Sequence, residues 1–168
     1  LIRLERENVR CIGNLGGTIL GTTNSGNPLR FPATMPDGSV VEQDRRADIL
    51  NFFSHHQLDA LITIGGDGTL TIANALHESG LVVIGVPKTI DNDLSGTDHC
   101  PGYASAAKYI ATSCMELYQD ARVYDTGTVV IVEIMGRHAG WLAGAAGLAT
   151  WAGSGPDLIY LPEVDFSM

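Results

Sequence analysis

In ALITIGGDGT, residues 60–69, a short apolar run leads directly into a glycine-rich turn. The apolar run predicts a buried strand over residues 59–64, and the amphipathic residues after the turn predict a helix over 69–79. A glycine-rich turn from a strand into a helix presents backbone N–H groups at the helix N-terminus, where they attract anions. The sequence therefore predicts a phosphate-binding turn at this position.

The turn also contains an acidic residue, Asp67. The glycines around it let a phosphate approach the backbone, because a Cβ atom would occupy that space. A carboxylate repels a bare phosphate, so Asp67 indicates a bridging Mg²⁺ ion. A turn of this composition is also found as a simple tight connection, and taken alone it does not separate the two interpretations.

Composition excludes several classes of function. The chain has 168 residues, enough for one well-buried domain. Its net charge of −9 argues against general binding to nucleic acid or to a membrane surface. The 3 cysteines are far apart, which suits reduced thiols in the cytosol better than disulfides or a zinc site. No apolar run has the length needed to cross a membrane.

Strands and helices are expected to alternate along most of the chain. Further strands are expected over 81–86, 127–134 and 158–161, and further helices over 41–57, 102–119 and 139–151. Apolar strands that alternate with helices predict an α/β fold, with a Rossmann-like parallel sheet flanked by helices.

The N-terminal part is expected to be less regular. Residues 1–9 are expected to be the tail of a helix, and residues 11–23 a strand edge followed by a loop. Glycine, asparagine and proline punctuate residues 24–38, so we expect an irregular surface excursion there.

Two further loops carry chemistry and follow predicted strands. Ligands of a parallel sheet bind beyond the carboxyl ends of its strands. Loops 65–69, 87–93 and 135–140 are therefore expected to face one site.

The second loop, 87–93, contains two carboxylates and a cation. Asp91 and Asp93 lie two positions apart, so one is suited to act as a general base while the other orients it or helps to hold metal. Lys88 is the local cation for a phosphoryl group. Taken singly, the aspartates are also common turn formers and the lysine is usually solvated.

The third loop, 135–140, contains Arg137 beside a glycine at a predicted helix start. Its guanidinium is suited to fork onto phosphate oxygens. A single arginine there is more often a surface ion-pair partner. The coincidence of three such loops on one sheet edge favours a common site.

Together these residues resemble the 6-phosphofructokinase family. Gly65–Thr69 (GGDGT), Pro87–Asp93 (PKTIDND) and Met135–Arg137 (MGR) match three motifs of that family in order, and Gly16–Thr22 looks like its upstream glycine segment. The resemblance spans nearly the whole chain. The first motif is shared with lipid and NAD kinases, whereas the second is highly specific, which disfavours those kinases.

The resemblance implies a cytoplasmic kinase of glycolysis that transfers the terminal phosphoryl group of ATP to the 1-hydroxyl of fructose 6-phosphate. It implies that Asp67 serves Mg²⁺, and that the nucleotide phosphates are lined by Gly66, Gly68 and Thr69. It implies contacts to the sugar phosphate from Thr89, Ile90, Asp91, Asp93, Met135, Gly136 and Arg137. The catalytic residues would be Asp91 as base, with Asp93 supporting it, and Arg137 and Lys88 as cations.

The identity of the phosphoryl donor depends on two positions. Gly68 leaves room for the α-phosphate and nucleoside of ATP, whereas an aspartate there would fill and repel it. Lys88 is typical of pyrophosphate users in this family, and its combination with Gly68 resembles a mixed branch that uses ATP. The steric argument favours ATP, and a pyrophosphate-dependent enzyme remains the alternative.

The resemblance also implies a domain organisation. Residues 1–161 would be the nucleotide-binding lobe of a two-lobed fold, incomplete at its N-terminus, and residues 162–168 would begin the connection to a substrate lobe. The full-length protein would be a homo-oligomer, a dimer or tetramer. Some relatives carry an arginine near the start of the strand before Met135 that reaches a neighbouring subunit, and Thr126–Thr128 has none. Arg30 is a candidate for the ATP-side arginine of the glycine-rich segment, but the insertion at 24–28 leaves that alignment open. A catalytically inert nucleotide-binding fragment is the alternative for the isolated chain.

Overall fold

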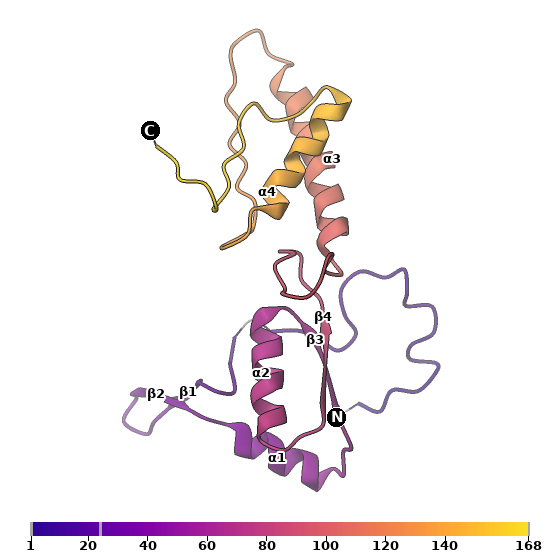
Figure 1. Ribbon diagram of the computed structural model, residues 1–168, viewed down its shortest axis with the longest axis vertical. Coiled ribbons are helices and arrows are strands. Elements are labelled where there is room, and N and C mark those ends of the chain that lie inside the picture. The colour runs from indigo at the N-terminus through magenta and orange to yellow at the C-terminus, as the bar shows by residue number, and fades with distance from the viewer. Residues whose placement is uncertain (1, 24, 168) are drawn as a thin grey trace. The chain divides into compact units, whose positions relative to one another are not determined.

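The computed structural model describes residues 2–23 and 25–167. The chain divides into two compact units, Leu1–Arg45 and Arg46–Met168 (Figure 1). The candidate loops identified from the sequence all belong to the second unit.

The first unit contains a β-hairpin. Strand β1 (Phe31–Thr34) pairs antiparallel with β2 (Val40–Gln43), with Phe31 opposite Gln43. Asp37 closes the turn, because its carboxylate accepts hydrogen bonds from the Ser39 hydroxyl at 2.6 Å and from the Ser39 N–H at 2.9 Å. These bonds, led by that from the hydroxyl, lower the pKa of Asp37.

The hairpin corrects two predictions. Residues 31–34 are a strand inside the segment 24–38 that was expected to be irregular. The helix expected over 41–57 begins only at Arg46, because residues 40–43 pair as a strand. Residues 2–5 take no regular structure and residues 6–9 form turns, so no helix is present there, and no strand forms in the described part of 11–23.

The second unit begins with a βαβ arrangement. Helix α1 (Arg46–His55) leads to strand β3 (Leu61–Gly65), helix α2 (Asp67–Glu78) and strand β4 (Val83–Pro87). The strands are parallel, with Leu61 opposite Val83 and Gly65 opposite Pro87. Helix α2 buries Ala73 and Leu76. It packs so closely on β4 that a Cβ on Gly85 would approach Leu70 Cδ2 to 2.7 Å. The predicted strand, turn and helix are confirmed here.

The remaining regular structure of the second unit is helical. Helix α3 (Tyr103–Ala121) packs against α4 (Trp141–Ala145) and the 3₁₀ helix η1 (Ala146–Ala152), as Figure 1 shows. Small residues allow this close approach. The buried side chains here are Ala107, Leu142, Ala145, Ala146 and Ala149. The helix expected over 139–151 therefore forms, but its second part is 3₁₀.

Two predicted strands are absent from the described residues. Residues 127–134 and 158–161 have no ladder partner there and take no regular structure. The side chains of Val129 and Ile131, which would share one face of a strand, are 88% and 91% exposed, so nothing covers that face among the described residues. A run of β-branched residues favours extended backbone, but a strand also needs a neighbour to pair with. The fold is α/β with a parallel strand pair and packed helices, as predicted, and its sheet is smaller than predicted.

Candidate functional site

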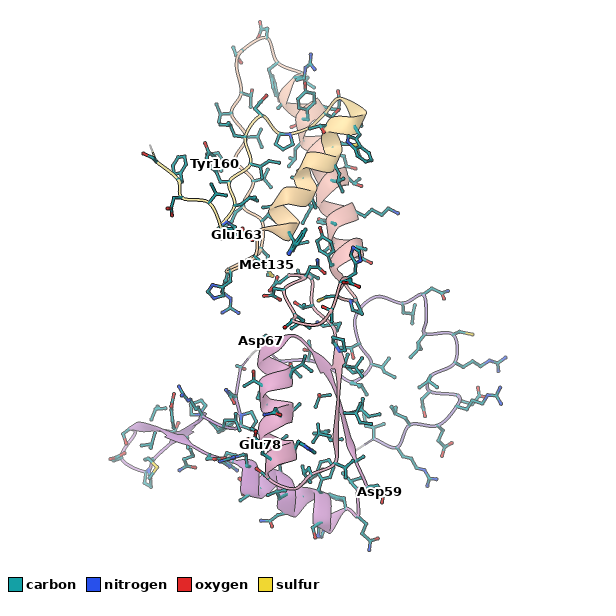
Figure 2. The ribbon with its side chains drawn as sticks, in the orientation of Figure 1. Asp59, Asp67, Glu78, Met135, Tyr160 and Glu163 are labelled. Carbon is teal, nitrogen blue, oxygen red and sulfur yellow. The ribbon has the colours of Figure 1, made fainter. Side chains whose placement is uncertain are left out.

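The first loop is a tight turn from β3 into α2. Strand β3 ends at Gly65, Gly66 is the N-cap, and α2 begins at Asp67. A glycine cap supplies no side-chain acceptor, so the first N–H groups of α2 are available to an anion. Figure 2 shows Asp67 at this end of α2, with Glu78 toward the opposite end. Asp67 is exposed to solvent.

The glycines of this turn differ in what surrounds them. A Cβ on Gly65 would overlap the side chain of Thr69, so the turn is closed against its own helix there. A Cβ on Gly66 would lie 3.4 Å from Thr89 Cβ. A Cβ on Gly68 would meet no heavy atom within 4 Å, so that side of the turn is open.

The second loop lies directly beside the first. The Lys88 N–H donates to the Gly65 carbonyl at 2.9 Å, immediately after the strand pair ends. Thr89 then passes over Gly66. Because the two strands end level with one another, the glycine turn and the aspartate loop meet at one sheet edge.

Thr89 fixes the start of the second loop. Its N–H donates to the Pro101 carbonyl at 3.1 Å, and it bridges to Gly102. Its hydroxyl Oγ1 accepts a hydrogen bond from the Asp91 N–H at 3.2 Å. The backbone before Asp91 is thus tied to the segment that begins α3.

Asp91 is half-buried, and its Oδ1 atom is buried without a hydrogen-bond partner among the described residues. Buried carboxylate oxygens are normally paired, so an unpaired one is suited to receive a ligand proton or a cation. Lys88 and Asp93 are exposed, and Ile90 is half-buried. Asp91 is therefore the most enclosed charged group of this loop.

The third loop is compact, and a residue from a later segment of the chain bonds to its end. Gly136 has φ of 153°, and a Cβ there would approach the Ala139 carbonyl oxygen to 2.6 Å. The Gly140 N–H donates to Glu163 Oε1 at 2.7 Å. Figure 2 shows Glu163 near the start of α4. Arg137 is exposed, and Met135 is 71% exposed.

Tyr103, which follows the segment bonded to the second loop, contacts the residue that follows the third loop, Trp141. The Tyr103 hydroxyl donates to the Trp141 carbonyl at 3.4 Å, and the two rings lie edge to face with centroids 6.4 Å apart. Tyr103 follows Gly102, the bridge partner of Thr89. The structure thus brings the first two loops into contact, whereas the third is connected through α3 and α4.

Three residues beside these loops had no site role assigned from the sequence: Asn92, Tyr103 and Glu163. Asn92 offered a signal, since it stands between two aspartates and asparagine tolerates left-handed backbone. The contacts of Tyr103 and Glu163 join segments distant in sequence, 38 and 23 residues apart, and no local pattern indicates them.

The oxygen ligands present suit Mg²⁺. No group of three or more His, Cys, Asp or Glu residues that would hold a metal occurs among the described residues. Magnesium does not require one, because it binds through one or two carboxylates together with substrate phosphates. Asp67 at the open glycine turn, with the unpaired Asp91 Oδ1 on the adjoining loop, fits such a site.

Comparison with known proteins agrees with these features. The family model described as Phosphofructokinase matches residues 1–168. An ATP-dependent 6-phosphofructokinase 1 from Nostoc sp. is 42% identical over 167 residues, which is 99% of this chain and 44% of the Nostoc protein. A pyrophosphate–fructose 6-phosphate 1-phosphotransferase from Dictyoglomus thermophilum is 42% identical over 162 residues, 96% of this chain and 42% of that protein.

A solved structure is also similar. The crystal structure of a pyrophosphate-dependent phosphofructokinase from Marinobacter aquaeolei matches with a TM-score of 0.64 and 37% identity, over 79% of this chain and 36% of that one. The chain thus spans less than half the length of the relatives it matches. No helix in the described part of the chain is long and apolar enough to cross a membrane. Since the family model covers the chain from end to end, this chain belongs to the phosphofructokinase family.

Proposed function

We propose that the protein carrying this chain transfers the terminal phosphoryl group of ATP to the 1-hydroxyl of fructose 6-phosphate, giving fructose 1,6-bisphosphate. The observation that supports this most strongly is the contact between the glycine turn and the aspartate loop, through Lys88 N–H and Gly65. It puts the glycine turn beside the loop that carries Asp91, whose Oδ1 is buried and unpaired among the described residues. A donor phosphate and a sugar hydroxyl would therefore meet at this edge.

The first loop is assigned to the donor. Gly66, Gly68 and Thr69 would line the phosphates of the nucleotide, with the N-terminus of α2 supplying N–H groups. Asp67 would hold Mg²⁺, which when bound neutralises charge on the phosphate oxygens. Lys88 would add a positive charge where the second loop begins.

The second loop is assigned to the acceptor. The Asp91 carboxylate would take the proton of the 1-hydroxyl as the new oxygen–phosphorus bond forms and the bond to the ADP leaving group breaks. Asp93 would support Asp91. Thr89 and Ile90 would line the sugar beside it.

The third loop is assigned to the sugar phosphate and to the negative charge on the phosphoryl group during its transfer. Met135 and Gly136 would contact the sugar phosphate, and Arg137 would also stabilise the moving phosphoryl group. Little covalent chemistry falls to the protein in such a reaction, so the acceleration would come from positioning and electrostatics. The exposure of Arg137 leaves its guanidinium accessible to a phosphate.

Pyrophosphate is the second candidate donor. Lys88 favours it, and the Dictyoglomus and Marinobacter relatives carry pyrophosphate in their names. The open space beside Gly68 favours ATP, because a Cβ built there meets no atom beyond its chain neighbours and its own helix backbone within 4 Å, which leaves room for the nucleoside side of the donor. We therefore place ATP first.

We further propose that residues 1–161 are a nucleotide-binding lobe and that 162–168 lead toward a substrate lobe. We also propose a cytoplasmic homo-oligomer, dimer or tetramer. The cysteines Cys11, Cys100 and Cys114 all have free thiols, which accords with a reducing compartment.

The deciding experiment measures fructose 1,6-bisphosphate formed from fructose 6-phosphate and Mg²⁺, with ATP and pyrophosphate in parallel reactions. Turnover with ATP alone supports the proposal, and turnover with pyrophosphate alone replaces the donor. A folded protein that turns over neither donor supports the inert-fragment interpretation. The Asp91→Asn variant is the control for contaminating kinase, because product that still forms at the wild-type rate would come from another enzyme.

A further inference from the structure

Asn92 lies between the two aspartates of the second loop and has an unusual backbone conformation. Its φ is 56°, in the left-handed region that most side chains avoid and asparagine tolerates. Its side-chain Oδ1 accepts a hydrogen bond from the Cys100 N–H at 2.8 Å, across 8 residues of sequence. The chain thus changes direction immediately after Asp91, and the change is tied to a distant point.

That point is firmly packed. Cys100 is 2% exposed, and its carbonyl accepts a hydrogen bond from the Tyr103 N–H at 3.1 Å, at the start of α3. The Thr97 hydroxyl donates to the Leu94 carbonyl at 2.8 Å and lies 3.1 Å from Cys100 Sγ. The Asn92 side chain is therefore bonded to a fixed turn rather than to a mobile loop.

Asp91 is held on its other side by Thr89. The Asp91 N–H donates to Thr89 Oγ1, and Thr89 is itself bonded to Pro101. The backbone is thus fixed on both sides of Asp91 to residues 100–101. Its carboxylate, in contrast, keeps Oδ1 buried and without a partner among the described residues. This arrangement fixes the direction of a carboxylate while leaving it available to another molecule.

We infer that Asn92 is a positioning residue for phosphoryl transfer, because its left-handed backbone and its bond to the Cys100 N–H together aim the Asp91 carboxylate at the sugar hydroxyl. The inference rests on the proposed function. Asn92 acts through Asp91 and need not touch the substrate. A small error in the direction of a general base costs much of its effect, since a displacement of about 1 Å can lower a rate by roughly 100-fold.

Three substitutions separate the two properties of Asn92. Asn92→Gly keeps the left-handed backbone but removes Oδ1, and Asn92→Ala removes both. Asn92→Asp keeps a side-chain acceptor and a residue that tolerates positive φ. Asn74→Ala is the matched control, since Asn74 is an exposed residue of α2 whose side-chain amide donates to Glu78 Oε1, one helical turn away, at 2.9 Å.

The first readout is turnover. We expect kcat of Asn92→Ala to fall roughly 100-fold and that of Asn92→Gly by about tenfold, with the KM for the donor nearly unchanged. Asn92→Asp should recover much of the loss, and Asn74→Ala should match the wild type. Purely structural damage would lower the amount of folded enzyme and leave kcat per folded molecule unchanged.

The second readout is amide hydrogen exchange at Cys100, which does not depend on catalysis. We expect protection in the wild type and in Asn92→Asp, and faster exchange in Asn92→Gly. An active wild type with unchanged kcat in folded Asn92→Gly would overturn the positioning role alone, as would unchanged protection of Cys100 in that variant. A folded wild type that makes no fructose 1,6-bisphosphate would overturn the proposed function and the positioning role with it.

Discussion

Replacing Gly65 by alanine should destabilise the protein, whereas the same change at Gly68, three residues later in the same turn, should not. A Cβ on Gly65 would lie 2.5 Å from Thr69 Cβ and 2.8 Å from Thr69 Cγ2. Neither atom is the end of a flexible side chain, because Thr69 is β-branched and anchored in the first turn of α2. The strand end and the helix start must therefore move apart to admit the methyl group.

The magnitude follows from the geometry of the two positions. Overpacking by one methyl group costs about 1–3 kcal/mol, and the overlap with Thr69 puts Gly65→Ala in the upper part of that range. The φ of Gly65 is not positive, so backbone strain adds nothing to this figure. Gly68 lies inside α2 with open space around it, where alanine gains about 0.5–1 kcal/mol over glycine.

Urea unfolding followed by circular dichroism measures both free energies of unfolding. For a chain of this size, a loss of 1 kcal/mol corresponds to a fall in Tm of roughly 2–4 °C. A Gly65→Ala variant that unfolds at the wild-type urea concentration would contradict the overlap with Thr69. A Gly68→Ala variant that loses as much stability as Gly65→Ala would contradict it equally.

The remaining predictions concern chemistry. Asp91→Asn should lower kcat by about 10²–10⁴-fold or more while calorimetry finds unchanged nucleotide affinity, and unchanged turnover would remove the base assignment. Arg137→Ala should lower kcat and raise the KM for fructose 6-phosphate, and equal kinetics would exclude it from the site. Gly68→Asp should weaken use of ATP relative to pyrophosphate in paired assays. Burial raises the pKa of Cys114, so its alkylation at pH 8 should lag behind that of exposed Cys11, by mass spectrometry, and should gain more as the pH rises.

The local part of the fold was predictable from the sequence. The apolar run 60–64 and the glycines after it predict β3, the turn and the start of α2 to within a few residues. Local patterns are enough here, because an apolar strand and an amphipathic helix can each be recognised from neighbouring residues alone. The β1–β2 hairpin was missed although a signal existed. Asp37-Gly38 is a strong hairpin turn, and Val40 and Val41 follow it, but the surrounding prolines suggested irregular chain.

The nonlocal part was not predictable. Residues 127–134 have every local property of a strand, but a strand also needs a partner, which residue preferences do not supply. The third loop was expected to follow this strand and so to lie at the same sheet edge as the other two loops. Because the strand does not form among the described residues, the described contacts do not place the third loop beside the other two. The first two loops meet because β3 and β4 are neighbours in one parallel pair.

The uncovered apolar run has a consequence for the behaviour of the molecule in solution. Four successive β-branched residues, Val129–Val132, are exposed and uncharged, and on β3 and β4 the side chains of Ile62 and Ile84 are 62% and 55% exposed. Such segments pair readily with the same segment of another chain. The net charge of −9 opposes this by mutual repulsion, which weakens toward the pI of about 4.8 and with added salt. Low pH and high salt should therefore favour aggregation of this chain, and a mildly alkaline buffer of low ionic strength should keep it dispersed.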